Sequence, residues 1–199
     1  MRKLLTFAAI AGLALSVVAV SQPKKQANST LKVDVKQSSF KWTGKKVTGS
    51  HWGYVKFAEG TLNIAGKQFI GGTFAMDMPT IDVQDIQGEY NEKLVGHLKS
   101  DDFFSVDKFA KATLVTKSAT PIANAKAGSA NYNVVADLTI KGITKEISFP
   151  AQIIIAKDKV IANAEFPVDR TLFDIKYTGM ADNLIENNFM VNVRVVASK

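Results

Sequence analysis

Apolar residues recur at every second position along most of this chain, and this period constrains the fold more than any other feature. From Leu31 onward, one face of each segment is apolar and the intervening positions are mostly polar or small. Examples are Leu31/Val33/Val35, Phe40/Trp42, Phe74/Met76/Met78, Tyr132/Val134/Ala136/Leu138/Ile140 and Phe189/Val191/Val193/Val195. Such alternation is typical of β-strands with one buried face and one wetter face.

Turn-forming residues separate these segments. They include Ala65-Gly66-Lys67, Gly71-Gly72, residues 124–128, Lys141-Gly142 and residues 157–159. Many strands joined by short turns predict an all-β fold, either a closed barrel or a two-layer sandwich. Residues 153–155 and 160–162 are apolar at consecutive positions, and both architectures explain this, because a covered outer face would also be apolar.

Two segments interrupt the strand period. Leu94, Val95 and Leu98 have helical spacing, which predicts a short helix. Residues 178–188 are short and polar, and we expect a turn of helix or a loop there. The chain has no internal repeat, and we expect a single domain.

The N-terminal residues predict export. Met1 is followed by the basic residues Arg2 and Lys3, and residues 4–20 are apolar and uncharged. Ala19 and Ser21 fit a small-x-small cleavage pattern. We therefore expect a signal peptide at 1–21, a flexible lead at 22–30 and the folded domain at 31–199, in a periplasmic or secreted protein. The sequence has no cysteine, which excludes disulfides and thiolate chemistry, so the core alone must stabilise the domain.

The charge distribution argues against a nucleic-acid groove. The formal net charge is +7, but it comes from scattered lysines and not from an arginine-rich stripe. Attraction to anionic lipid head groups fits this charge better, and transient contact with a membrane remains an open alternative.

Residues 93–109, KLVGHLKSDDFFSVDKF, contain the densest group of reactive side chains. His97 lies near Asp101 and Asp102, and His51 is the only other histidine, so a mixed metal site of these four is one hypothesis. The sequence contains no HExxH and no GxSxG motif, and Ser50 and His51 are neighbours that would point to opposite faces of a strand. We favour a structural role in which Ser100, Asp101 and Asp102 form caps and turns, Phe103 and Phe104 anchor the segment, and His97 donates a hydrogen bond to a backbone carbonyl.

Asp169 and Arg170 form a charged pair within the apolar segment FPVDRTLFDIKY. If buried, each needs the other or a ligand. Arg170 is therefore the best single residue for contacting a polar head group, and an ordinary strand end is the alternative.

The segments EKLVGHLKSDDFFSVDKF, DLTIKGITKEISFPA and FPVDRTLFDIKY, with GSHWG and GGTFAMDMPTI before them, resemble the YceI-like family of exported bacterial polyisoprenoid-binding proteins. The resemblance covers the chain from Leu31 to its end. It implies an antiparallel, eight-stranded, lipocalin-like barrel with one or two short helices and an elongated apolar lumen. It implies binding of a long isoprenoid, such as a polyprenyl quinone or its precursor, or a similar amphiphile, with no catalysis and no cofactor. Many relatives have proline where this chain has Ala110.

A slender apolar tail fits this lumen, because its burial is favourable without specific polar contacts. The predicted wall, lid and head-group residues are Phe74, Met76, Met78, Leu94, Leu98, Phe103, Phe104, Tyr132, Leu138, Arg170, Phe173, Phe189 and Met190. Two alternatives remain: an exported stress-response or interaction module with a filled barrel, and a hydrolase-type enzyme using His51 and His97. The sequence fixes no oligomeric state, since a barrel has no long open edge to pair.

Overall fold

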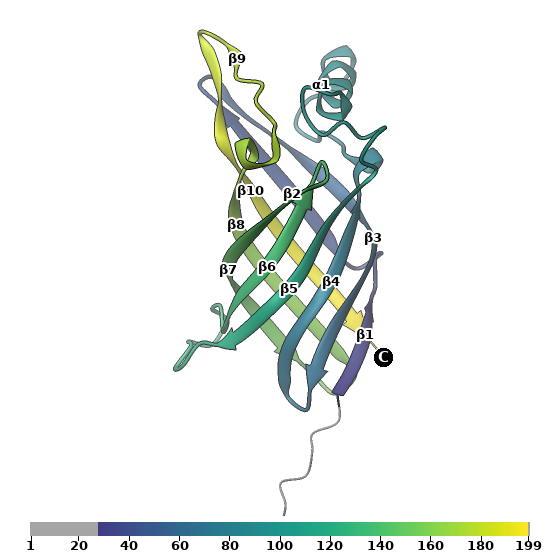
Figure 1. Ribbon diagram of the computed structural model, residues 1–199, viewed down its shortest axis with the longest axis vertical. Coiled ribbons are helices and arrows are strands. Elements are labelled where there is room, and N and C mark those ends of the chain that lie inside the picture. Colours follow the sequence, from purple (N-terminus) through teal and green to yellow (C-terminus); the bar gives the residue numbers. More distant parts are fainter. Residues whose placement is uncertain (1–27, 199) are drawn as a thin grey trace, which may run out of the picture.

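The computed structural model describes residues 28–198 and shows one closed, antiparallel β-barrel (Figure 1). Its strands are β1 (Asn28–Val33), β2 (Ser39–Lys46), β3 (Gly49–Ala65), β4 (Gln68–Asp77), β5 (Lys111–Pro121), β6 (Tyr132–Ile140), β7 (Ile143–Ile155), β8 (Lys159–Asp169), β9 (Gly179–Met180) and β10 (Asn183–Ser198). Its helices are the 3-10 helices η1 (Met78–Thr80) and η2 (Arg170–Phe173) and the α-helix α1 (Glu89–Lys99). The all-β fold and the short helix near Leu94 are thus confirmed.

Strand β10 closes the ring, because it pairs with β2 on one side and with β8 on the other. The pairing with β8 runs from Asn188 opposite Asp169 to Ser198 opposite Lys159. Strands β2 to β8 pair in chain order, so eight strand positions complete the barrel. β1 takes the place of β2 at one end, where it pairs with both β3 and β10. This continuous pairing excludes the sandwich alternative.

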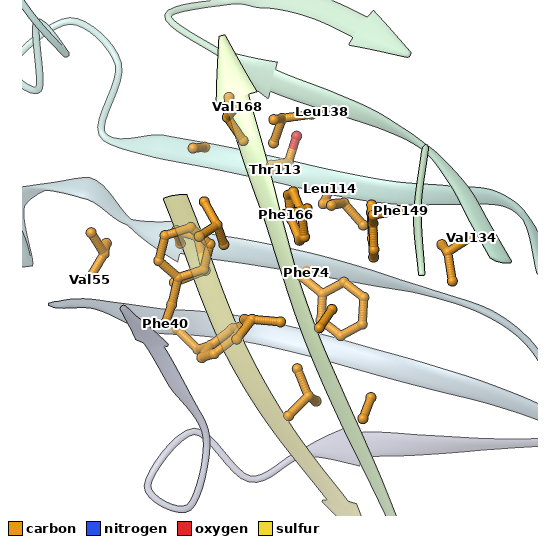
Figure 2. A pocket seen from close by; sticks show the side chains of 18 of the residues that line it. Phe40, Val55, Phe74, Thr113, Leu114, Val134, Leu138, Phe149, Phe166 and Val168 are labelled. Atoms are coloured by element: carbon orange, nitrogen blue, oxygen red, sulfur yellow. The ribbon is translucent and has the colours of Figure 1, made fainter. Parts of the chain in front are cut away.

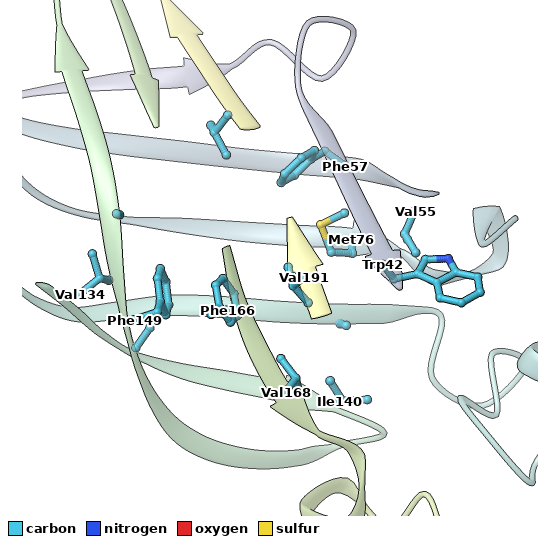
Figure 3. Packing of buried hydrophobic residues seen from close by; sticks show 14 of the residues in the cluster. Trp42, Val55, Phe57, Met76, Val134, Ile140, Phe149, Phe166, Val168 and Val191 are labelled. Carbon is cyan, nitrogen blue, oxygen red and sulfur yellow. The ribbon is translucent and has the colours of Figure 1, made fainter. Parts of the chain in front are cut away.

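The apolar face of each strand points into the barrel. Phe57, Met76, Phe149, Phe166 and Val191 project from five different strands toward the same interior (Figure 3). Phe149 and Phe166 stack with ring centroids 4.2 Å apart. The period of two in the sequence therefore reflects the alternation between lumen and exterior.

The connection between β4 and β5 covers one end of the barrel. Figure 1 shows α1 and the β9–β10 hairpin at this end, and β1 with the C-terminal end of the chain at the other. Residues 81–86 continue beside β3 where β4 has ended: the Asp82 amide donates to Tyr54 O (3.0 Å) and the Gln84 amide to Trp52 O (2.9 Å). After α1, Ser100 ends the helix, and the chain turns back to place Phe103 in the core. The capping and anchoring roles expected of Ser100 and Phe103 are therefore observed.

Residues 178–188 form a β-hairpin, so the expectation of a helical turn or loop was wrong. β9 pairs with the start of β10 through Met180–Asn183 and Gly179–Leu184. Gly179 has φ +85°, a backbone angle that glycine adopts without strain, and the Ile185 amide donates to Thr178 O (2.9 Å). The sequence of this segment is typical of a loop because the hairpin extends past the end of the barrel. Both of its faces contact solvent there, so no apolar alternation is needed.

The expected signal peptide and most of the expected lead lie outside the described residues. β1 begins at Asn28, so three residues of that lead are paired with β3. No helix within residues 28–198 is long and apolar enough to cross a membrane.

We predict that Gly53→Ala destabilises the domain by more than about 2 kcal/mol, measured by urea unfolding. A Cβ atom at position 53 would lie 2.0 Å from the carbonyl oxygen of Asp82, which would force residues 81–86 away from β3. Gly96→Ala is the matched control, because Gly96 is exposed in α1 with no atom within 4 Å of an added Cβ. It should stabilise the helix by about 0.5–1 kcal/mol. An unchanged midpoint for Gly53→Ala would contradict the close packing of residues 81–86 on β3.

Candidate functional site: an apolar lumen with a buried arginine at one end

The barrel interior holds a cavity of about 120 Å³. Figure 2 shows Phe40, Phe74, Phe149 and Phe166 among the side chains that surround it. The wall receives residues from β2 to β8 and β10, and the β4–β5 connection adds Met78, Ile81 and Phe104. The connection therefore forms the roof of the cavity at the covered end.

The chemistry of this wall is almost wholly apolar. Eight phenylalanines line it, together with Trp42, Met76, Met78 and aliphatic side chains. Among the described residues, Thr113, Thr116 and Asn163 are its only lining residues with a hydroxyl or amide side chain, and none of its lining residues is charged. Asn163 is satisfied by Gln152 (3.0 Å) and Arg194 (3.3 Å). The buried hydroxyl of Thr116 has no hydrogen-bond partner in the described part of the chain.

The cavity has a small volume in this structure. An engineered apolar cavity of about 150 Å³ in another protein stays dry and admits one benzene. A longer chain would need lining side chains to change rotamer, and Met76 and Met78 are suited to this because methionine is flexible and polarizable.

A second cavity of about 60 Å³ adjoins the covered end. It shares three lining residues with the main cavity: Trp42, Phe104 and Phe189. The rings of Phe104 and Phe189 meet edge to face with centroids 6.4 Å apart. These three aromatic side chains therefore form the partition between the two cavities.

Arg170 lines the second cavity and is only 4% exposed. Its guanidinium donates to three backbone carbonyls: Nη1 to Ile175 (2.7 Å), Nε to Glu186 (3.1 Å) and Nη2 to Ile185 (3.3 Å). Burial lowers the pKa of Arg170, and the negative charge of Asp169 partly offsets this. The Asp169 carboxylate itself caps η2 by accepting from the Thr171 amide (2.9 Å) and hydroxyl (2.7 Å).

The model of the YceI-like domain family matches residues 31–197. The chain belongs to this family. A UPF0312 protein of Staphylococcus aureus strain MRSA252 is 48% identical over 62 residues, which cover 31% of this chain and 30% of that protein. The alignment thus spans less than a third of the curated relatives it matches.

Solved structures share the YceI-like barrel at low sequence identity. BcnA of Burkholderia cenocepacia has a TM-score of 0.69 and 19% identity, covering 83% of this chain and 99% of BcnA. A polyisoprenoid binding domain from Saccharophagus degradans has a TM-score of 0.60 and 14% identity, covering 87% and 99%. A mutant of the Campylobacter jejuni YceI protein has a TM-score of 0.52 and 18% identity, covering 96% and 93%. At these identities the comparisons show a common fold.

The YceI-like barrel gathers most of the predicted site residues around its two cavities. Phe74, Met76, Met78, Phe104, Leu138 and Phe189 line the main cavity, and Leu98, Phe103, Phe104, Arg170 and Phe189 line the smaller one. Whether these side chains contact a ligand stays a prediction.

Four predicted residues line neither cavity. Phe173 is fully buried in the core, and Tyr132 is buried where its hydroxyl accepts from the Phe69 amide (3.2 Å). Leu94 packs against the core from α1. Met190 alternates with the lining residues Phe189 and Val191, so its side chain lies on the outer face of β10.

Much of the wall was not predicted from the sequence, including Phe40, Val55, Phe57, Phe149, Phe166 and Trp42. Phe40 and Trp42 stood in a recognised alternating segment, and the same-face rule would have assigned them to the lumen. To assign the remaining residues, one must know which face of β3, β7 and β8 points into the barrel. The sequence of a single strand does not reveal this.

Neither histidine lines a cavity in the described structure. The His97 ring meets Phe103 and Tyr177 edge to face, with ring centroids 4.9 Å and 4.6 Å apart. Its Nε2 lies 3.2 Å from the Asp102 carboxylate. The expected bond from His97 to a backbone carbonyl was therefore wrong, because the turn after α1 brings Asp102 to the ring.

His51 contacts a different carboxylate, that of Asp85, at 2.7 Å. Burial alone would raise the pKa of Asp85, but hydrogen bonds from the Trp52 amide and His51 outweigh it and lower the pKa. Residues 28–198 contain no group of three His, Cys, Asp or Glu side chains placed to share a metal ion, so the proposed four-residue site is not assembled.

We predict that Thr116→Val stabilises the domain by about 1 kcal/mol in urea unfolding. The substitution keeps the shape of the side chain and removes a buried hydroxyl that has no partner. Thr113→Val, at another lining position, should give a smaller gain, because the Thr113 hydroxyl is not an unpartnered buried group. A loss of stability in Thr116→Val would show that the hydroxyl is satisfied within the fold.

Proposed function

We propose that this chain is an exported binding protein that encloses the tail of a long-chain isoprenoid or a similar amphiphilic lipid. The observation that carries the proposal is the closed lumen, whose lining has many aromatic rings and no charged side chain among the described residues. Such a lumen favours an apolar chain and offers little to a polar substrate.

The physical driving force is burial of apolar surface. Each square ångström of tail removed from water contributes about 25 cal/mol, and no specific polar contact along the tail is required. The small volume of the cavity favours a slender chain, and the flexible Met76 and Met78 let the wall adapt to it.

The comparisons support this proposal at the level of the family. The Saccharophagus degradans neighbour is described as a polyisoprenoid binding domain, and its barrel superimposes on this one. Export is supported by the basic residues 2–3 followed by the apolar run 4–20. A carrier in a cell envelope needs no cofactor and no nucleic-acid partner.

Catalysis is the less favoured reading. The cavity wall contains no titratable side chain in the described structure, while acid–base and nucleophilic catalysis both require one within reach of the substrate. A barrel wholly filled by side chains is also disfavoured, because the lumen retains a cavity of about 120 Å³.

We predict that the mature protein, purified from its host, carries a near-stoichiometric polyprenyl lipid visible by native mass spectrometry and identified after organic extraction. Ala164→Phe should abolish this mass shift, because position 164 lines the cavity and a ring there would occupy the path of the tail. The same measurement gives the mass of the processed N-terminus, which we expect after Ser21.

Glu165→Phe is the control for that variant. Glu165 is exposed on the same strand and faces away from the lumen, so its lipid content should match the unmodified protein. Circular dichroism melting of both variants separates blocked binding from misfolding. A protein that is empty, and that takes up neither polyprenols nor quinones in solution, would contradict the proposed function.

Replacing both histidines with alanine tests the enzyme alternative. We predict that lipid affinity changes by less than about threefold, or about 0.7 kcal/mol, because neither ring lines a cavity. Titration with a polyprenol measures this. Loss of binding in a variant that still folds would return His51 and His97 to the list of functional residues.

A further inference from the structure

The buried charge of Arg170 has no carboxylate partner within 4.0 Å among the described residues. Its nearest acidic neighbour in sequence, Asp169, directs its carboxylate to Thr171 instead. Arg170 is as buried as core leucines, at 4% exposed. A buried cation is costly unless an opposite charge or several hydrogen bonds compensate it.

Backbone carbonyls compensate this charge only in part. A guanidinium has five N–H donors, and three of them are used by the carbonyls of Ile175, Ile185 and Glu186. These three bonds explain how Arg170 holds η2 against the start of β10. They leave two donors and a net positive charge beside the second cavity.

The second cavity has the size and the surroundings of a site for one small polar group. Its volume is about 60 Å³, and most of its lining is apolar, with Leu98, Phe103 and Ile175 among the side chains. Glu186 also lines it, but Glu186 is an exposed residue, so solvent screens its negative charge. In such apolar surroundings the attraction between an anion and Arg170 is stronger than in water.

The two cavities are close enough for one ligand to reach both. Trp42, Phe104 and Phe189 line both cavities, so a tail in the lumen would pass between these rings to reach the Arg170 side. The apolar lumen offers a head group no charged partner, whereas the second cavity offers one.

We propose that Arg170 and the second cavity form a head-group site that selects amphiphiles with an anionic head, a carboxylate or a phosphate, over neutral alcohols and quinones of the same chain. An anionic oxygen neutralises the guanidinium and accepts from its two unused donors, whereas a hydroxyl or quinone carbonyl leaves the charge uncompensated. This inference rests on the proposed function, because it requires the tail to occupy the lumen.

The first test uses the full mature protein and a series with one tail and different heads. Geranylgeraniol, geranylgeranoic acid and geranylgeranyl monophosphate are titrated at neutral pH, with fluorescence of Trp42, which lines both cavities, as the readout. Trp52→Phe removes the only other tryptophan. We expect both anions to bind at least about tenfold more tightly than the alcohol, since one charge-assisted hydrogen bond gives that factor.

Variants of the two arginines in the described structure assign the preference. Arg170→Gln should reduce the ratio of anion to alcohol affinity to below about threefold. Arg170→Lys keeps the charge and should retain part of the preference, so it serves as a second variant if Arg170→Gln does not fold. Arg194→Gln is the control, because Arg194 is exposed on β10 and lines neither cavity.

The outcomes separate this inference from the proposed function. Equal or tighter binding of the alcohol, or an undiminished anion preference in a folded Arg170→Gln, would overturn the head-group site and leave the carrier intact. Failure of all three ligands to bind would overturn both. Inorganic phosphate and acetate are tested as competitors of the lipid anions, and competition by either at the affinity of the lipid anions would show a free-anion site and reject the head-group assignment.

Discussion

Ring closure by β10 is the constraint on which the rest of the structure depends. A long strand that pairs with β2 on one side and β8 on the other leaves no open edge in the barrel wall. The backbone polar groups of the wall are then satisfied by neighbouring strands, and the inward side chains need provide no hydrogen bonds. Only under this condition can the lumen be lined by phenylalanine, methionine and aliphatic residues.

Closure also explains how far the fold could be predicted from the sequence. Alternation identified the strands around Phe40, Phe74, Tyr132 and Phe189, because that signal is local. It left barrel and sandwich unresolved, since both produce the same alternation, and the choice depends on pairing between β8 and β10 at the ring seam. The family resemblance supplied the barrel, and the continuous pairing then confirmed it.

The candidate site was partly predictable for the same reason. Residues in clear alternating segments, such as Phe74, Met76 and Phe189, were placed correctly on the lumen side. Tyr132 stands in a similar alternating strand but packs in the core beside the cavity, and no feature of a single strand distinguishes core from lining positions. Phe173 lies in η2, outside the alternating strands, and is also buried in the core. The burial of Arg170 was raised as one of two alternatives, because the three carbonyls that hold it come from residues 5 to 16 positions further along the chain.

The two ends of the barrel differ in what opening them would cost. Separating wall strands breaks continuous ladders of backbone hydrogen bonds, such as those between β8 and β10. The covered end has no such continuous ladder: the backbone of residues 82 and 84 donates to β3, and the rest is held by side chains, including Phe103, Phe104 and the contact of His97 with Tyr177. Local opening is drawn from the least stable part of a structure, so the proposed function would place ligand exchange at this end. It is also the end where Arg170 lies, and a ligand that enters tail first would bring its head group to rest beside the one buried cation of the described chain.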